Sequence, residues 1–353
     1  MKRKRVAVLF GGRSSEYDVS LETAAAVLAH IDRTAFEVVP VWIERESGAW
    51  NIVPDGVPAE ETARWLEAAP RTRAVLSPDR FTRGLVLLAG RSPLRAVQLD
   101  AALPLLHGKN GEDGTVQGAF ELAGIPVVGC GAECSAICMD KRLAHLVAEA
   151  AGVPAPRSLL VRKRDFERTG APDGASSVGF PCLVKPVRSG SSIGISLVGS
   201  ASGLDAALRL AFERDDEALV EERIEGFEVG VAVLEQRGEL VCGEPDEIEI
   251  SEGFFDFHEK YSLETSSIHV PARIPAPERA GVQALARRVF RALGCRGFAR
   301  VDFFRAADGR LLFNEVNTVP GFTAHSRFPM MMAAAGWTFE RTVNEILAEG
   351  VDR

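Results

Sequence analysis

The feature that most constrains the fold is a β-hairpin signal in residues 297–318, which read GFARVDFFRAADGRLLFNEVNT. Two apolar runs flank Asp308 and Gly309, and an Asp-Gly pair in that position is a strong sign of a two-residue hairpin loop. Such a loop places Ala307 opposite Arg310. Counting back along both strands then gives the rest of the pairing, so this stretch predicts two adjacent antiparallel strands with a defined register.

The predicted register brings four polar side chains to one face of the hairpin. Asp302 faces Glu315. Arg300 faces Asn317, and strand alternation places both pairs on the same side. Two carboxylates directly opposite each other repel unless a cation lies between them. Carboxylate and amide oxygens suit Mg²⁺, which also binds phosphate, so we interpret this face as a metal site. The alternative is a solvated charged face on a hairpin with a longer loop.

Length, composition and charge limit the class of protein. A chain of 353 residues is long for one hydrophobic core and predicts two or three domains. Hydrophobic residues make up 46% of the chain and charged residues 25%, which is typical of a globular protein. The net charge of −8 argues against a nucleic acid or an anionic membrane as the main partner.

No stretch of the sequence predicts a membrane span. The longest apolar runs, such as residues 84–90 (GLVLLAG), are far shorter than a bilayer requires. The first residues, MKRKRVAVLFGG, carry basic groups like a signal peptide, but the short apolar stretch that follows favours a first β-strand. The six cysteines include no CxxC pair and lie mostly in apolar runs. This pattern indicates buried, reduced thiols and a cytoplasmic location.

Strands and helices alternate over the first 130 residues. The predicted strands and helices of this part are 5–10, 21–31 (helix), 36–43, 97–106 and 114–124 (helix). An alternation of this kind is typical of a parallel α/β domain. It ends at IPVVGCG, near residue 130.

The rest of the chain predicts two further units. A helix over 139–151 ends at Gly152 and Pro154. A compact α+β unit follows, with strands at 158–162, 181–185, 193–198 and 218–221 and a helix at 203–214. The last part combines a helix at 277–293 with strands at 228–234, 239–243, 298–304 and 311–316. We therefore expect an N-terminal α/β substrate domain, a central domain and a C-terminal catalytic domain over residues 1–140, 141–224 and 225–353.

A lysine before a small-residue loop suggests phosphate binding. Lys185 ends the apolar strand PCLVK, and the loop 189–194 (SGSSIG) would let backbone N–H groups approach phosphate oxygens. The loop is not a Walker A sequence, and a plain hairpin turn is an equally good interpretation. The chain has seven lysines against thirty-four arginines, yet it places lysine at 141, 185 and 260. A compact ammonium group is thus expected at these positions.

Several motifs, in order, resemble those of one family. The segments are VAVLFGGRSSEYDVSLETA, LHGKNGEDGTVQGAFELAGIPVVG, SAICMDK, VKPVRSGSSIGIS, VEERIEGFEVGVAVL, FFDFHEKY, ARVDFF and NEVNTVPGFTAHSRFP. Together they are similar to the D-alanine–D-alanine ligases of the ATP-grasp superfamily, over nearly the whole chain. The resemblance implies an ATP-grasp fold of three domains, ATP and two Mg²⁺ or Mn²⁺ ions as requirements, a role in peptidoglycan precursor synthesis and a homodimer.

The resemblance also implies the residues that bind the nucleotide. They are Lys141, Lys185, Ser192, Glu221, Glu222, Ile224, Glu228 and Asn314. The lysines would contact the phosphates of an ATP molecule lying between the central and C-terminal domains. Glu221 and Ile224 would contact adenine, and Glu228 the ribose, although the acids could also be exposed residues of a domain linker. The metal ions would be held by Asp302, Glu315 and Asn317, in agreement with the hairpin register.

The implied reaction proceeds through an acyl phosphate. The carboxylate of a first D-alanine attacks the γ-phosphate, and the amine of a second D-alanine then displaces phosphate. Glu16, backed by Ser191 and Tyr261, would anchor the first ammonium group. Arg300 and the N–H of Gly321 would stabilise the oxyanion, where preorganised donors have the largest effect.

The remaining roles concern the phosphoryl group and the second substrate. Lys260 would neutralise the transferring phosphoryl, Ser326 would bind the second carboxylate, and His107 would lie near the first substrate. His258 and Arg327 resemble residues of the vancomycin-resistance ligases, so D-lactate or D-serine is the alternative second substrate. His258 could equally be a loop histidine beside the site. From another class, a nucleotide-binding regulatory protein without catalysis is a further alternative.

Overall fold

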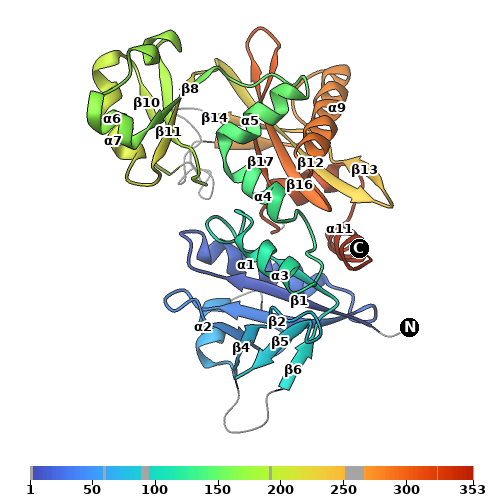
Figure 1. Ribbon diagram of the computed structural model, residues 1–353. Helices are drawn as coiled ribbons and strands as arrows, with labels where there is room; N and C mark the ends of the chain where they lie inside the picture. The colour runs from blue at the N-terminus through green and yellow to red at the C-terminus, as the bar shows by residue number, and fades with distance from the viewer. Residues whose placement is uncertain are drawn as a thin grey trace.

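The structure, a computed structural model, describes residues 3–58, 61–88, 95–190, 193–250, 266–323 and 325–352. Three β-sheets follow one another along the chain (Figure 1). In Figure 1 the first sheet lies at the bottom, the second at the upper left and the third at the upper right. Among the described helices, none combines the length and the apolar character that a membrane span requires.

The first sheet has parallel strands at one end. Strands β1 (Lys4–Gly11), β2 (Phe36–Ile43) and β7 (Ala101–Pro104) pair in parallel, and helix α1 (Tyr17–His30) connects the first two. The buried strand β1 is almost continuously apolar, as expected for a parallel strand covered on both faces. Helix α3 (Thr115–Leu122) follows β7. The predicted parallel α/β arrangement is therefore present at the end of the sheet that β7 forms.

Four antiparallel strands extend this sheet beyond β2. They are β3 (Trp50–Ile52), β4 (Thr72–Leu76), β5 (Gly84–Leu87) and β6 (Arg95–Gln98), with helix α2 (Thr62–Ala68) between β3 and β4. The prediction of one strand over 97–106 was wrong, because the chain turns at Leu99 and Asp100. Strand β6 is a largely exposed edge strand at one end of the sheet, and the buried β7 is at the other end.

The second sheet is small and wholly antiparallel among its described strands. Its order is β10-β9-β11-β8, formed by Ser196–Val198, Cys182–Pro186, Glu217–Glu222 and Ser158–Arg162. Helices α6 (Lys163–Thr169) and α7 (Leu204–Ala211) contribute apolar side chains to a core with one face of this sheet. The strands lie within a few residues of the predicted ones, because short apolar runs between turn residues mark them clearly.

The third sheet is covered on both faces. Its path is β15-β14-β12-β16-β17, with β13 on β12; the strands are Ser266–His269, Asp246–Ile250, Gly226–Gln236, Phe298–Ala306, Leu311–Asn317 and Glu239–Cys242. Val231 and Val233 of β12 point to a core shared with helices α4 (Ala132–Met139), α5 (Lys141–Ala150) and α9 (Ala276–Ala292). Ala232 and Leu234 point to the opposite core. This alternation explains why β12 is apolar at nearly every position.

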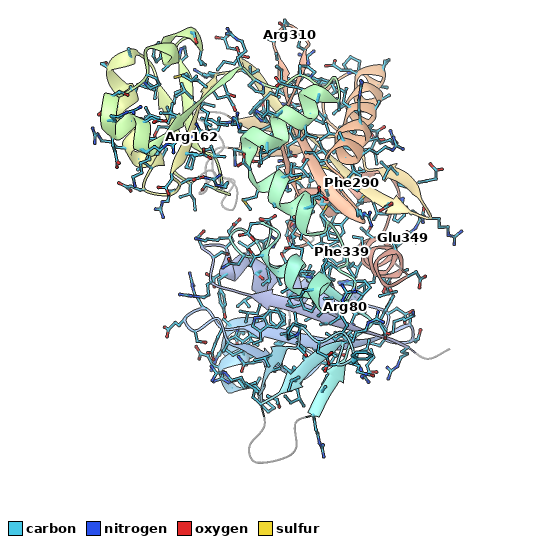
Figure 2. All side chains as sticks on the ribbon, viewed as in Figure 1. Arg80, Arg162, Phe290, Arg310, Phe339 and Glu349 are labelled. Atoms are coloured by element: carbon cyan, nitrogen blue, oxygen red, sulfur yellow. The ribbon has the colours of Figure 1, made fainter. Side chains whose placement is uncertain are left out.

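The opposite core joins the two ends of the chain. Helices α10 (Arg327–Ala334) and α11 (Phe339–Val351) pack there with α1 and the first sheet. Phe339, at the start of α11, contacts the rings of His30 and Phe322, with centroid distances of 4.8 and 5.9 Å (Figure 2). The first and third sheets are thereby fixed to one another by a shared apolar core.

The hairpin β16–β17 has the predicted register at the end that carries the polar pairs, but its loop differs from the predicted one. Arg300 pairs with Asn317 and Asp302 with Glu315, as expected. Near the turn, however, Ala306 faces Arg310 across a three-residue loop, and Arg310 marks the outer end of the hairpin in Figure 2.

A β-bulge reconciles the two halves of the hairpin. The pairing shifts between Asp302 and Phe303, so that Phe303 faces Phe313 and Asn314 is the extra residue. Gly309 adopts φ +87°, the left-handed conformation that a three-residue loop requires. The prediction of a two-residue loop was wrong. The longer loop and the bulge each shift the register by one residue, in opposite directions, so the pairing beyond the bulge is the predicted one.

Candidate active site

A cavity of about 380 Å³ collects residues from all three regions of the chain. It is lined by Glu16 at the start of α1, the loop after β7, the junction of α4 and α5, the loop after β9, the hairpin β16–β17 and the segment leading into α10. The sequence-predicted residues that line it are Glu16, His107, Lys141, Arg300, Glu315, Asn317, Gly321, Ser326 and Arg327. These nine lie far apart in sequence, and the fold brings them to one place.

The paired carboxylates of the hairpin each contact a positively charged side chain of the protein. Asp302 is fully buried and accepts hydrogen bonds from Arg300 Nε at 2.9 Å and Nη2 at 2.8 Å. Asn317 Nδ2 donates to the same carboxylate at 2.9 Å. Lys141 Nζ lies 3.7 Å from Glu315 Oε2. The repulsion expected between the two acids is thus offset by Arg300 and Lys141, while two carboxylates and an amide still offer oxygen ligands suited to Mg²⁺ at one point.

Arg327 is held in a buried network beside Asp302. Its Nε and Nη2 donate to Asp246 at 2.6 and 2.9 Å, and its Nη1 donates to Glu228 at 2.6 Å. Burial alone would lower the pKa of Arg327, but the carboxylates of Asp246 and Asp302 raise it well above its usual value. Arg327 is therefore a permanent positive charge at the floor of the cavity.

Gly230 of β12 makes room for this network. A Cβ atom at this position would lie 2.4 Å from Arg327 Nη2, 2.6 Å from Asp302 Oδ1 and 2.8 Å from Asp246 Oδ1. The strand cannot shift sideways, because Gly230 pairs with Asp246 on one side and Asp302 on the other. Only glycine allows the arginine and the two carboxylates to meet here.

Lys185 and Glu221 form a buried ion pair away from the cavity lining. Their side chains are 5% and 0% exposed, and Lys185 Nζ donates to Glu221 Oε1. Within the described parts of the chain, Glu221 Oε2 has no hydrogen-bond partner. A buried acceptor without a partner is costly, so this oxygen is suited to receive a donor from a bound molecule. His145 lies close by, and burial lowers its pKa while Glu221 opposes that shift.

The other predicted nucleotide contacts come from separate segments and have different surroundings. Asn314, the bulge residue, places Nδ2 3.5 Å from Glu228 Oε2. Ile224 is half-buried between β11 and β12. Glu222 accepts from the Arg157 backbone N–H at 2.9 Å and from Arg157 Nε at 2.8 Å, so both of its oxygens are already engaged.

The N-terminal wall of the cavity holds the carboxyl groups of Glu16, Glu22 and Glu112 and the ring of His107. His107 is buried, and both of its ring nitrogens form hydrogen bonds. Nε2 lies 3.2 Å from Thr23 Oγ1, and Nδ1 lies 3.0 Å from the Val319 carbonyl oxygen. Burial lowers the pKa of His107, although Glu16 opposes the shift. At neutral pH the ring is therefore uncharged and donates Nδ1–H to Val319.

Glu112 was not singled out from the sequence, yet it belongs to this wall. It accepts from the backbone N–H of Gly108 at 2.7 Å and of Val319 at 3.3 Å. Burial, with a contribution from Glu16, raises the pKa of Glu112 to about 8. Its position between glycines in LHGKNGEDG was the available sequence signal. Near neutral pH, Glu112 is therefore mostly protonated and adds little negative charge to this wall.

Gly321 and Ser326 approach closely at the opposite wall. Ser326 is the N-cap residue of α10, and its hydroxyl accepts from the Thr323 backbone N–H at 3.0 Å. A Cβ atom at Gly321 would lie 3.0 Å from Ser326 Oγ. Ser326 and Arg327, at the start of α10, line the cavity, and the N-terminus of a helix favours an anion. The predicted residues Ser191, Ser192, His258, Lys260 and Tyr261 lie outside the described residues.

The chain matches two protein families. The D-ala D-ala ligase N-terminus family matches residues 5–130, and the D-ala D-ala ligase C-terminus family matches residues 147–348. The chain belongs to the D-alanine–D-alanine ligase family. The fold is accordingly the ATP-grasp fold, and the family implies a ligase that uses ATP and a divalent metal.

Individual relatives cover the whole chain. The vancomycin B-type resistance protein VanB of Enterococcus faecalis is 42% identical and covers 100% of both chains. D-alanine–D-alanine ligase A of Mesorhizobium japonicum is 40% identical, over 100% of this chain and 99% of its own length. The crystal structure of the VanG D-Ala:D-Ser ligase from Enterococcus faecalis matches with a TM-score of 0.89 and 44% identity, over 98% of this chain and 99% of that chain.

Proposed function

We propose that the protein joins two D-alanine molecules to D-alanyl-D-alanine with ATP, through a D-alanyl phosphate, for peptidoglycan precursor synthesis. The observation that carries this proposal is the single cavity that unites Glu16, Lys141, Arg300 and Ser326. Such a cavity offers a carboxylate for an ammonium group, cations for phosphate and a helix N-terminus for a carboxylate. These are the groups that two amino acids and a phosphoryl donor present.

The divalent metal required by the family fits the end of the hairpin. We propose that Asp302, Glu315 and Asn317 hold two Mg²⁺ or Mn²⁺ ions. When bound, the ions would neutralise charge on the phosphate oxygens. Lys141 and Lys185 would hold the phosphates, and Glu221 Oε2 would accept from the adenine amino group, since this oxygen has no other partner among the described residues.

The chemical steps are assigned to the walls of the cavity. Glu16 would bind the ammonium of the first D-alanine, whose carboxylate oxygen attacks the γ-phosphorus as the bond to ADP breaks. The deprotonated amine of the second D-alanine would attack the carbonyl carbon of the acyl phosphate, and the C–O bond to phosphate would break. Arg300 and the Gly321 N–H would stabilise the oxyanion formed between these events.

The charge of the N-terminal wall suits one ammonium group. Because the pKa of Glu112 is raised to about 8, Glu112 adds little negative charge to this wall near neutral pH. A neutral His107 adds no positive charge that would oppose the substrate.

D-Lactate or D-serine is the alternative second substrate. VanB is a vancomycin-resistance protein, and the solved VanG enzyme is a D-Ala:D-Ser ligase. Incubation with ATP, Mg²⁺, D-alanine and each of D-lactate and D-serine, followed by mass analysis of products, tests the choice. We expect D-alanyl-D-alanine as the main product. The absence of D-alanine-dependent phosphate release from ATP would contradict the ligase proposal and favour a nucleotide-binding regulatory protein without catalysis.

We further propose that the domain limits are 1–140, 141–224 and 225–353 and that the protein is a homodimer. The three sheets support the division, although α4 and α5 pack on the third sheet. Light scattering after size-exclusion chromatography measures the mass in solution, and a monomer would contradict the dimer.

A further inference from the structure

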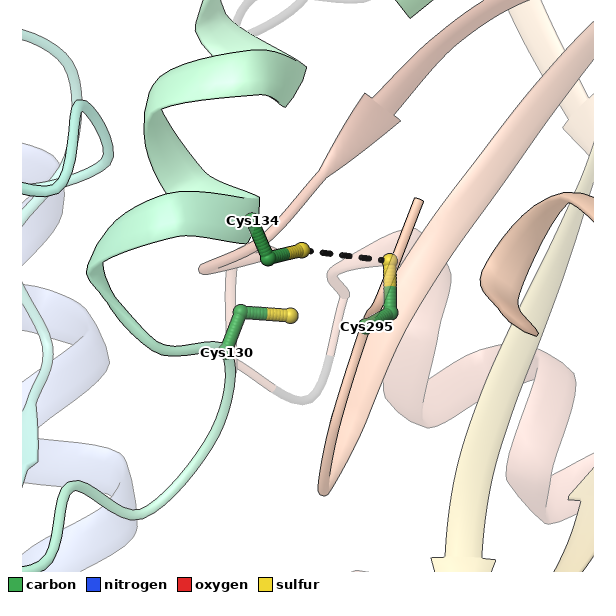
Figure 3. Close-up of side chains that lie close together, drawn as sticks. All are labelled: Cys130, Cys134 and Cys295. Atoms are coloured by element: carbon green, nitrogen blue, oxygen red, sulfur yellow. Dashed lines mark hydrogen bonds between the residues drawn. The ribbon is translucent and has the colours of Figure 1, made fainter. Parts of the chain in front are cut away.

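Four cysteines from separate segments meet in the core beside the third sheet. We call them the four-cysteine cluster: Cys130, Cys134, Cys138 and Cys295. The first precedes α4, the next two lie one turn apart on α4, and the last follows α9 just before β16. All are buried and none forms a disulfide. Figure 3 shows Cys130, Cys134 and Cys295 pointing toward one another.

The spacing of the sulfur atoms fits a metal site. The Sγ atoms of Cys130, Cys134 and Cys295 all lie within 4.8 Å of one another. Cys134 Sγ is 3.5 Å from Cys295 Sγ and 3.8 Å from Cys138 Sγ. Tetrahedral zinc with Zn–S bonds of about 2.3 Å requires S–S separations of about 3.8 Å. The sulfur atoms of Cys130, Cys134 and Cys295 are already close to that spacing. Cys138, whose Sγ lies 3.8 Å from Cys134 Sγ, would complete the site after a rotation of its side chain.

We propose that the four-cysteine cluster is a thiolate site for a soft, tetrahedral metal ion such as Zn²⁺. Cysteine thiolates are the ligands that select zinc over magnesium, so this site is chemically distinct from the oxygen ligands at the end of the hairpin. Each thiol gives up its proton to solvent as its sulfur bonds to the metal, and no oxidant is required. The site would therefore be a closed, structural one.

The surroundings distinguish these cysteines from the other two. Buried thiols often serve as small apolar groups, as Cys242 does beside α9. Burial raises the pKa of Cys242 to about 11, so it stays protonated. Within the cluster, the thiols instead lie against other sulfur atoms, as Cys134 Sγ does 3.5 Å from Cys295 Sγ. Cys134 also lies in the first turn of α4, where the helix dipole favours a thiolate.

The position of the cluster gives the ion an entry route and a role. Cys138 lines the active-site cavity, so an ion can reach the cluster from there. Cys138 lies three residues before Lys141, and Cys295 lies five residues before Arg300. A bound ion would link the two segments that carry these cations and fix their separation. The inference does not depend on which second substrate the enzyme uses.

Cobalt titration of the full-length, reduced protein tests the proposal. Co²⁺ reports on zinc sites because thiolate coordination gives a near-ultraviolet charge-transfer band, which carboxylate ligands do not. With excess Mg²⁺ present, we expect the band to saturate near one equivalent of Co²⁺ and to disappear when Zn²⁺ is added. Cys134→Ala should abolish the band, and the matched control Cys242→Ala should retain it.

Two further measurements keep the test decisive. If Cys134→Ala does not fold, as judged by circular dichroism, Cys295→Ser replaces it. Zn²⁺ should also raise the melting temperature of the wild type and of Cys242→Ala, because an ion that binds only the folded state stabilises it. A wild-type protein with no charge-transfer band at equimolar Co²⁺, or an equal band in a folded cluster variant, would overturn the proposal.

Discussion

Replacement of Glu112 by glutamine should change how stability depends on pH. The pKa of Glu112 is raised from 4.5 to about 8, mainly by burial, so the folded protein binds a proton that the unfolded chain releases. Stability therefore falls as pH rises from about 4.5 to about 8, since the unfolded state binds fewer protons there. Glu112→Gln lacks this carboxyl group and should lose that slope.

The size of the effect follows from the same interval. At about 1.4 kcal/mol for each pH unit, the interval between 4.5 and about 8 corresponds to a ceiling of about 5 kcal/mol. Glu112 is only partly buried, so we expect about half of this. Glutamine has one acceptor where the carboxyl group serves two backbone N–H groups, and that loss should cost about 1 kcal/mol at every pH.

Urea denaturation from pH 5 to pH 9 measures the difference in unfolding free energy between variant and wild type. Glu112→Gln should be less stable than wild type near pH 5 and more stable near pH 9. Asp113→Asn, at the next residue of the same loop, controls for the removal of one negative charge. A difference that is constant over the whole range would refute the reasoning, because it would mean that Glu112 ionises in its ordinary range.

Three other substitutions test the centre of the site. Gly230→Ala should destabilise the protein by about 3 kcal/mol in urea denaturation, because it breaks a buried ion pair, whereas Gly199→Ala, with open space around it, should be near neutral. Glu315→Gln should abolish turnover in a phosphate-release assay without unfolding the protein; normal activity would contradict the metal role. Arg327→Lys should lower kcat/KM for the second substrate about tenfold to hundredfold, because lysine cannot reproduce the two hydrogen bonds to Asp246. An unchanged kcat/KM would show that Arg327 has no role in binding the second substrate.

The hairpin shows why a prediction from sequence can be right at a site and wrong beside it. The sequence predicts the Asp302–Glu315 pairing correctly, although the loop has three residues and not the predicted two. The error was cancelled at Asn314, which carries no local sign of a bulge. The pleat and the burial of the strand faces fix the register, and the turn adjusts to them.

Other features depend on contacts that no local pattern contains. The apolar run 97–106 divides into two strands because Leu99 and Asp100 form a turn between opposite edges of one sheet. The raised pKa of Glu112 arises from burial by segments distant in sequence. The cysteines of the four-cysteine cluster have no metal-binding spacing in sequence, and Cys295 reaches the others only through the packing of α9 on the third sheet.

The shared core of the two chain ends has a consequence for synthesis on the ribosome. Leu28 of α1 packs in one cluster with Ile346 and Leu347 of α11, more than three hundred residues later. The first sheet can form its hydrogen bonds early, but its apolar covering is incomplete until the last helix has left the exit tunnel. We therefore expect nascent chains that lack residues 339–351 to expose this surface and to bind chaperones, and the native N-terminal region to become protease-resistant only on release of the finished chain.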